Sequence, residues 1–264
     1  MSFADLIQIF SYPFIGRALI VGALVSICAS LLGVILVLKR YSLIGHGLAD
    51  VGFASLSLAL AIGASPLYVS TPIIIITSFI IMYISQSKKI NGDVAIGIFS
   101  TGALAIGVII TALTKGFNID VYSYMFGSIL SIGQNDIIMS VILSAIVLVL
   151  FFLFYNRLFI VTIDEPFAKS IGINVSFYQF LISFLTALTV VLGMRMMGAL
   201  LISSLIIFPA IIAKKIARSF KGLMIIAAIS SIVCFLIGML FSFLFNIPTG
   251  AGIVAVNIIV MVLV

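Results

Sequence analysis

Charged residues are scarce in this chain: they make up 8% of its 264 residues, while 64% of the residues are hydrophobic. An ordinary soluble domain is about 45–50% apolar and about 25% charged. A soluble protein of this size has no room to bury so much apolar surface. The composition therefore excludes a soluble enzyme, a secreted disulfide scaffold and a free nucleic-acid-binding protein. Tryptophan is absent, so any aromatic belt at a membrane interface would consist of tyrosine and phenylalanine.

Cysteine is also rare: Cys28 and Cys234 are the only two, and both lie inside apolar runs. A free cysteine in such a run behaves as a small buried hydrophobe, and two of them do not indicate a disulfide framework. The sequence lacks a G-x-x-x-x-G-K-[ST] phosphate loop and the H-E-x-x-H motif of metalloproteases. We therefore expect a protein that is not an enzyme and has no nucleotide site of its own.

Long apolar runs fill most of the chain, and they are continuous rather than alternating, which indicates helices and not a membrane β-barrel. The pattern predicts an all-α polytopic membrane protein with a single transmembrane domain over residues 1–264. We expect about nine transmembrane helices, or eight because the last run is short. The runs are 13–38, 44–62, 67–84, 93–113, 136–155, 176–193, 196–213, 222–245 and 249–264. The more polar segment 117–132 is predicted to be re-entrant or to lie on the surface.

The basic residues are distributed unevenly between the loops. If the loop after the first helix is cytoplasmic, ten of the thirteen Lys and Arg residues fall in cytoplasmic loops and three fall outside. This split agrees with the positive-inside rule. It predicts a multi-pass protein with its N-terminus outside and, with nine helices, its C-terminus inside.

The longest predicted cytoplasmic loop spans residues 156–175 and contains a second helical pattern. Asp164 can cap a short helix whose first turn holds Glu165 and Pro166, and Gly172 is well placed to end it before Asn174 begins the next. One interpretation is an ordinary amphipathic loop. The other is a coupling helix that docks into a partner protein.

The second apolar run contains the most informative polar residues. His46 is the only histidine in the chain, and Asp50 follows it by four residues, so the two share one face of a helix. An ionisable residue inside a membrane helix indicates a functional site by default, and imidazole with carboxylate suits zinc, manganese or iron. A structural His–Asp hydrogen bond is the alternative. Zinc prefers about four ligands, so a twofold dimer, water or groups elsewhere would have to supply the others.

Four segments in order along the chain resemble one known family. LKRYSLIGHGLADVGFASLSLA, from Leu38, is similar to the L-R-R-x-S-L-x-G-D-A-L-S-H signature of the ABC-3 family, the membrane permeases of bacterial zinc, manganese and iron ABC importers. DEPFAKSIGINV, from Asp164, resembles its cytoplasmic D-P-E-F-A-R-x-L-G-I-N motif. RMMGALLISSLIIFPAIIAKKIA and PTGAGIVAV resemble two later stretches. The order of the two candidate ligands is reversed here, with His46 at the family's Asp position and Asp50 at its His position.

The resemblance implies a permease subunit that binds no cofactor permanently and passes a divalent metal, with zinc expected first and manganese next. The implied partners are a second permease copy, two cytoplasmic ATPase subunits, an extracytoplasmic metal-binding protein and membrane lipid in the bacterial cytoplasmic membrane, but no nucleic acid. His46 and Asp50 are the implied metal ligands. The implied ATPase-coupling residues are Asp164, Glu165, Pro166, Phe167, Ala168, Gly172 and Ile173. A cobalamin or siderophore permease and an ion-coupled secondary metal carrier are the alternatives.

Overall fold

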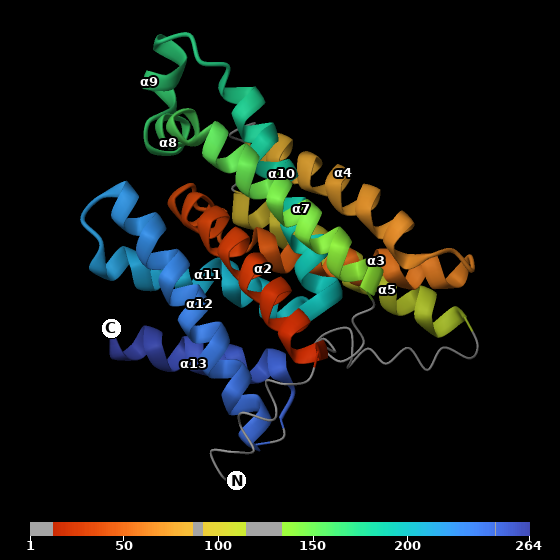
Figure 1. The fold of residues 1–264 in the computed structure, drawn as a ribbon. Helices are drawn as coiled ribbons and strands as arrows, with labels where there is room; N and C mark the ends of the chain where they lie inside the picture. Colours follow the sequence, from red (N-terminus) through yellow and green to blue (C-terminus); the bar gives the residue numbers. More distant parts are fainter. Residues whose placement is uncertain (1–12, 87–91, 115–133, 246) are drawn as a thin grey trace.

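A computed structural model describes residues 13–86, 92–114, 134–245 and 247–264, and the regular structure in these ranges is all α-helical (Figure 1). The predicted re-entrant segment 117–132 lies outside the described residues. The helices are α2 (Pro13–Leu38), α3 (Ile44–Ala61), α4 (Pro66–Gln86), α5 (Gly92–Leu113), α7 (Gln134–Leu153), α8 (Tyr155–Ile163), α9 (Glu165–Ser170), α10 (Val175–Met197), α11 (Ala199–Ile216), α12 (Phe220–Phe245) and α13 (Thr249–Leu263).

Seven helices in the described ranges are long and apolar enough to cross a membrane: α2, α3, α4, α5, α10, α11 and α12. An eighth span results if α7 and α8 are counted together, although the chain bends by 69° between them. Helix α13 is apolar but has only 15 residues, fewer than the roughly 20 that a span requires. The prediction of an all-α membrane protein is thus confirmed, whereas a count of nine spans is not.

The loop predicted at 156–175 begins with a helix that the sequence did not reveal. Helix α8 buries Leu158 and Val161, which are three residues apart and share one face, while Asn156 and Arg157 are exposed. This amphipathic spacing stabilises a helix against the end of the bundle instead of an extended loop. Helices α8 and α9 consequently form a helical cap at one end of the molecule (Figure 1).

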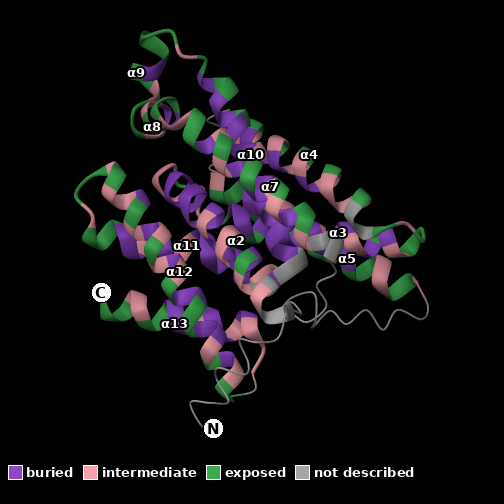
Figure 2. Ribbon diagram, viewed as in Figure 1, coloured by how far each residue is buried: buried purple, intermediate pink, exposed green. Residues whose placement is uncertain are grey.

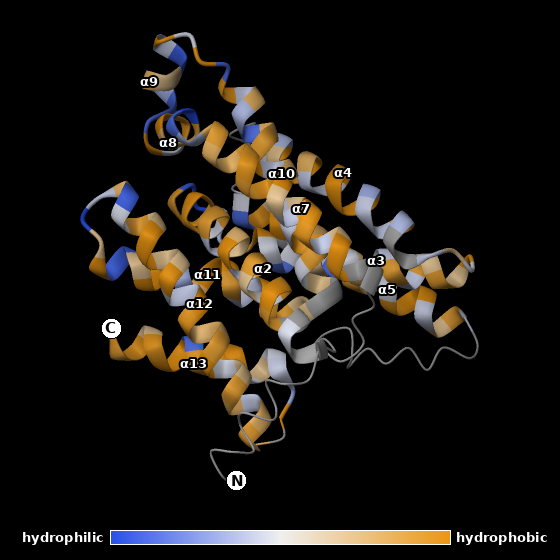
Figure 3. Cartoon of the chain, viewed as in Figure 1, coloured by the Kyte–Doolittle hydropathy of each residue, from blue (hydrophilic) through white to orange (hydrophobic). Residues whose placement is uncertain are grey.

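Helix α2 forms the centre of the bundle, where it packs against α7, α10, α11 and α12. In the most apolar stretch of α2, 72% of the residues are buried, whereas only 17% are buried in the corresponding stretch of α5. Buried residues concentrate around α2, α10 and α11 (Figure 2), yet hydrophobic residues also cover the outer faces of the helices (Figure 3). An apolar exterior of this kind is expected where lipid, and not water, surrounds the protein.

Glycines allow α3 to approach its neighbours closely. A Cβ atom on Gly45 would lie 2.6 Å from Cδ1 of Ile206 in α11, and one on Gly47 would lie 2.6 Å from Cγ2 of Ile96 in α5. Both distances are shorter than any tolerated carbon–carbon contact, so only glycine fits without displacing the neighbour. Small residues at helix interfaces favour such close packing in membranes. Helix α3 is therefore held between α5 and α11, which fixes the position of His46 and Asp50.

Candidate metal site and candidate coupling element

The structure brings the side chains of His46 and Asp50 together on α3. Nε2 of His46 lies 3.7 Å from Oδ2 of Asp50, which is within ion-pair range but longer than a normal hydrogen bond. The two side chains differ sharply in exposure: 61% for His46 and 11% for Asp50. The imidazole is therefore open to its surroundings, whereas the carboxylate is largely covered by the protein.

Asp50 has a partner that the sequence did not reveal. The hydroxyl of Ser100 in α5 donates a hydrogen bond to Oδ2 of Asp50, and Ser100 is itself buried. The bond that joins two helices at this site is thus Ser100–Asp50, and not a bond between His46 and Asp50. A single serine in an apolar run is too common a feature to single out, because its importance depends on which helix packs against it.

The ligand set is incomplete within the described part of the chain. No group of three or more His, Cys, Asp or Glu residues there could hold a metal ion. His46 and Asp50 supply two donor atoms of the kinds that zinc and manganese accept, nitrogen and oxygen. Any further ligands would come from hydroxyl groups, backbone carbonyls, water or another molecule.

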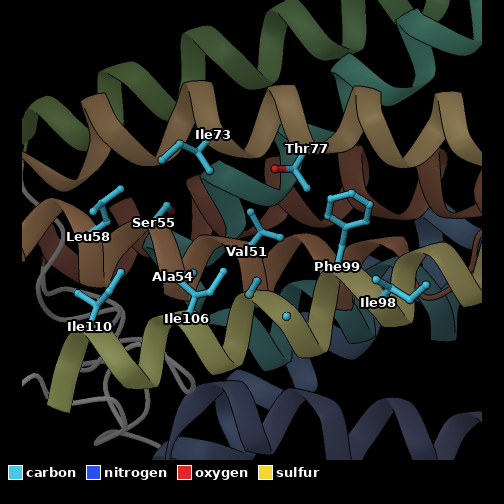
Figure 4. A pocket seen from close by; sticks show the side chains of 12 residues that line it. Val51, Ala54, Ser55, Leu58, Ile73, Thr77, Ile98, Phe99, Ile106 and Ile110 are labelled. Atoms are coloured by element: carbon cyan, nitrogen blue, oxygen red, sulfur yellow. The ribbon is translucent and has the colours of Figure 1, made fainter. Parts of the chain in front are cut away.

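A separate apolar cavity of about 390 Å³ lies between α3, α4 and α5 (Figure 4). Val51, Ile73, Phe99 and Ile106 are among the side chains that line it, and neither His46 nor Asp50 belongs to the lining. An apolar wall does not coordinate a metal ion. The cavity therefore does not form the candidate ion site.

Residues 164–174, called the 164–174 element below, form the short helix, the glycine turn and the start of the next helix that their local sequence predicts. Oδ1 of Asp164 accepts a hydrogen bond of 2.9 Å from the backbone N–H of Phe167, which caps α9. Gly172 adopts a φ of +80°, which favours glycine, and the N–H of Ile173 closes the turn on the carbonyl of Ala168. Asn174 then caps α10 through the N–H of Phe177. The helix–glycine–helix prediction is confirmed, while ATPase docking remains a prediction.

This element is anchored on one side and open on the other. Ala168 is fully buried against the rest of the protein, whereas Phe167 and Ile171 are 53% and 50% exposed. Pro166 is exposed and Ile173 is half-buried. Two apolar side chains are thus exposed at the end of the molecule, while Ala168 packs the element against the rest of the protein.

Glu165 connects this element to two other parts of the protein. Its Oε2 accepts a 3.0 Å hydrogen bond from Nε2 of Gln179 in α10 and lies 3.9 Å from Nζ of Lys39, just after α2. Its Oε1 pairs with Nζ of the exposed Lys169 at 3.0 Å. In the sequence, Lys39 was only one of the basic residues that predict the membrane orientation, and Gln179 was a single amide in an apolar run. Their pairing with Glu165 depends on tertiary structure.

Burial sets the electrostatics of this contact. The side chain of Lys39 is 7% exposed. Desolvation lowers the pKa of Lys39 below its ordinary value of 10.5, the charge of Glu165 acts in the opposite direction, and Lys169 lowers the pKa further. A buried ammonium group is costly without a partner. Glu165 is therefore the group that allows Lys39 to remain charged there.

Comparison with known proteins links these features to one family. The family described as "ABC 3 transport family" matches residues 11–264. The chain is 28% identical to the manganese transport system membrane protein MntC of Halalkalibacterium halodurans, over 94% of this chain and 85% of that protein. It is also 28% identical to the high-affinity zinc uptake system membrane protein ZnuB of Haemophilus influenzae, over 93% and 94% of the two chains. The solved structure of PsaBC from Streptococcus pneumoniae in complex with Fab has a TM-score of 0.86 and 28% identity, covering 99% of this chain and 95% of that one.

Proposed function

The chain belongs to the ABC 3 transport family, and from this premise we propose that it is the permease subunit of an ATP-driven importer of a divalent transition-metal ion. The observation that carries the proposal is the exposed imidazole of His46 beside the buried carboxylate of Asp50 in a membrane helix. Placing ionisable groups in lipid is costly, and they commonly mark an ion path. Two ligands bind weakly enough for an ion to leave again, as transport requires.

The transported metal is zinc or manganese. Relatives named for each metal share 28% identity with this chain. Imidazole suits zinc well, and carboxylate oxygen suits manganese. Zinc remains our first expectation and manganese the second. Neither ion is a resident cofactor, because both are the cargo.

The energy for transport comes from partner subunits in this proposal. Two cytoplasmic ATPases bind the 164–174 elements of two permease copies, through exposed groups such as Phe167 and Ile171. An extracytoplasmic metal-binding protein delivers the ion at the opposite membrane surface. The protein lies in the bacterial cytoplasmic membrane with its N-terminus outside and its C-terminus inside. ATP-driven closure of the ATPases moves the 164–174 elements and switches access to His46 and Asp50 between the two sides.

An uptake assay tests the assignment of the site. The permease is reconstituted in vesicles with the ATPase and binding protein of the same genome, and uptake of zinc and of manganese is measured. The double variant His46→Ala, Asp50→Ala should lose uptake while the complex still assembles. Thr111→Val is the matched control: the hydroxyl of Thr111 also bridges α5 to α3, through Ser57 at 3.1 Å, away from the site. Wild-type uptake by the double variant refutes the site.

The same assay separates the other transport classes. An ion-coupled secondary carrier takes up metal in vesicles that lack the ATPase, whereas the proposed importer does not. A cobalamin or siderophore permease would transport the chelate and not the free ion. ATP-independent uptake of zinc or manganese by the wild-type permease alone would overturn the ATP-driven mechanism.

A further inference from the structure

The five residues 39–43 join α2 to α3 in a tight turn. Arg40 has a φ of +62°, and it is the one non-glycine residue with a positive φ in the described ranges. The turn is closed by a 2.8 Å hydrogen bond from the N–H of Tyr41 to the carbonyl of Leu36, and the N–H of Ile44 bonds back to Tyr41. Glycine normally occupies such a position at a helix end. The 39–43 turn therefore has a defined backbone conformation.

Lys39, the first residue of this turn, reaches the coupling element directly. Its Nζ lies 3.9 Å from Oε2 of Glu165, the oxygen that also accepts from Gln179. One carboxylate group thus joins the end of α2, the start of α9 and the first turns of α10. Helix α9 also packs against α8 and α10, but Lys39 adds a link to the turn that leads into α3.

The same turn contacts the helix that carries Ser100. A Cβ atom on Gly92, at the start of α5, would lie 2.6 Å from Cδ1 of Tyr41, so the ring of Tyr41 covers the backbone there. Burial raises the pKa of Tyr41, and the charges of Glu165 and Asp93 raise it further, in agreement with its position between these elements. A displacement of the turn would therefore act on both α3 and α5, the two helices that position Asp50.

We propose that Lys39 is a positioning residue that links the 164–174 element to the turn before α3, so that movement of Glu165 is transmitted to His46 and Asp50. This role rests on the proposed function. Lys39 contacts neither the cargo nor the nucleotide. It acts through Glu165 on one side and through the 39–43 turn on the other. Loss of its charge uncouples ATP hydrolysis from transport and leaves assembly intact.

The variant Lys39→Met tests the link, because methionine preserves a long apolar stem and removes the charge. Glu165 then still has Gln179 and Lys169 as partners, so no unpaired buried charge remains. In the reconstituted transporter, metal uptake per ATP hydrolysed should fall at least about fivefold, the lower end of typical coupling between sites. Co-purification of the ATPase should be unchanged. The matched control Lys215→Met removes an exposed lysine outside the 164–174 element, whose Nζ donates to the carbonyl of Met261 in α13, and it should stay within about twofold of wild type.

Two further variants keep the result interpretable. Lys39→Arg restores the positive charge and should recover most of the lost coupling. The double variant Lys39→Met, Glu165→Gln removes both charges together, and it should be uncoupled like Lys39→Met even if the single variant folds poorly. Wild-type coupling in Lys39→Met, or an equal loss in Lys215→Met, overturns the role of Lys39. A wild-type complex that hydrolyses ATP but takes up neither zinc nor manganese overturns the proposed function, and this role with it.

Discussion

Replacing Ser100 with alanine isolates the contribution of a single hydroxyl to the candidate metal site. The hydroxyl of Ser100 donates to Oδ2 of Asp50 across the interface of α3 and α5. Only 11% of the Asp50 side chain is exposed, so water can replace little of this bond. A hydrogen bond to a charged group contributes about 1.5–3 kcal/mol. Without it, the carboxylate is no longer held in the orientation that faces His46.

That energy sets the expected size of the effect. Since 1.4 kcal/mol is a tenfold change in an equilibrium constant, the half-saturating metal concentration for uptake should rise by about ten- to a hundredfold. The assay is initial-rate uptake in vesicles containing the complete transporter, measured over a range of zinc and manganese concentrations. Ser100→Thr retains a hydroxyl and should restore most of the affinity.

A matched variant distinguishes a site effect from loosened helix packing. Thr111→Val removes the hydroxyl that bridges the same two helices through Ser57. This neutral bond contributes about 0.5–1.5 kcal/mol, so the melting temperature should decrease slightly while half-saturation stays within about twofold. Equal shifts of half-saturation in Ser100→Ala and Thr111→Val would show that Ser100 only packs the helices. An unchanged value in Ser100→Ala would refute its effect on Asp50.

Two other predictions concern packing and pH. Gly47→Ala places a methyl group 2.6 Å from Cγ2 of Ile96 and should destabilise the permease by about 1–3 kcal/mol in thermal unfolding. Gly97→Ala is the control, because a Cβ atom on Gly97 would have no neighbour within 4 Å. An equal loss of stability in both variants would contradict the packing argument. Because burial lowers the pKa of Lys39 below 10.5, Lys39 loses its proton, and its pairing with Glu165, at a lower pH than an exposed lysine would. Uptake per ATP in wild type should therefore decline toward the Lys39→Met value as the pH rises toward 10.5; a constant ratio between the two proteins would refute this. The free energy of unfolding should change in the opposite direction and rise with pH. The unfolded chain binds the Lys39 proton more tightly than the folded protein does, and loss of this proton at alkaline pH removes the cost of burying the charge.

Local signals explain which parts of the structure the sequence predicted. Asp164 and Gly172 define the 164–174 element through a cap and a left-handed turn, and both depend on neighbouring residues alone. The shared face of His46 and Asp50 follows from their spacing of four. The positions of the apolar helices follow in the same way, because continuous hydrophobic runs of this length have few alternatives in a membrane.

The missed features depend on contacts between distant segments. The 69° break between α7 and α8 lies close to the end of the apolar run predicted at 136–155, but hydropathy does not show that a second helix follows it. The partners of Asp50 and Glu165 are separated from them by 50 and 14 residues. Serine and glutamine in apolar helices become informative only when the opposite helix is known. Sequence patterns therefore identified the carboxylates, and the fold identified what holds them.

Two contacts that the sequence did not reveal, Lys39–Glu165 and Ser100–Asp50, are connected by a short segment of the chain. Lys39 is five residues before the start of α3, and Asp50 is six residues after it, about 9 Å along the helix axis at 1.5 Å per residue. Gly45 and Gly47 let Ile206 of α11 and Ile96 of α5 pack closely against this segment of α3. In the link that we propose, a displacement of Glu165 moves the 39–43 turn and the first two turns of α3, and so changes the distance between Asp50 and Ser100. The candidate metal site is therefore connected to the 164–174 element through a short segment of the chain.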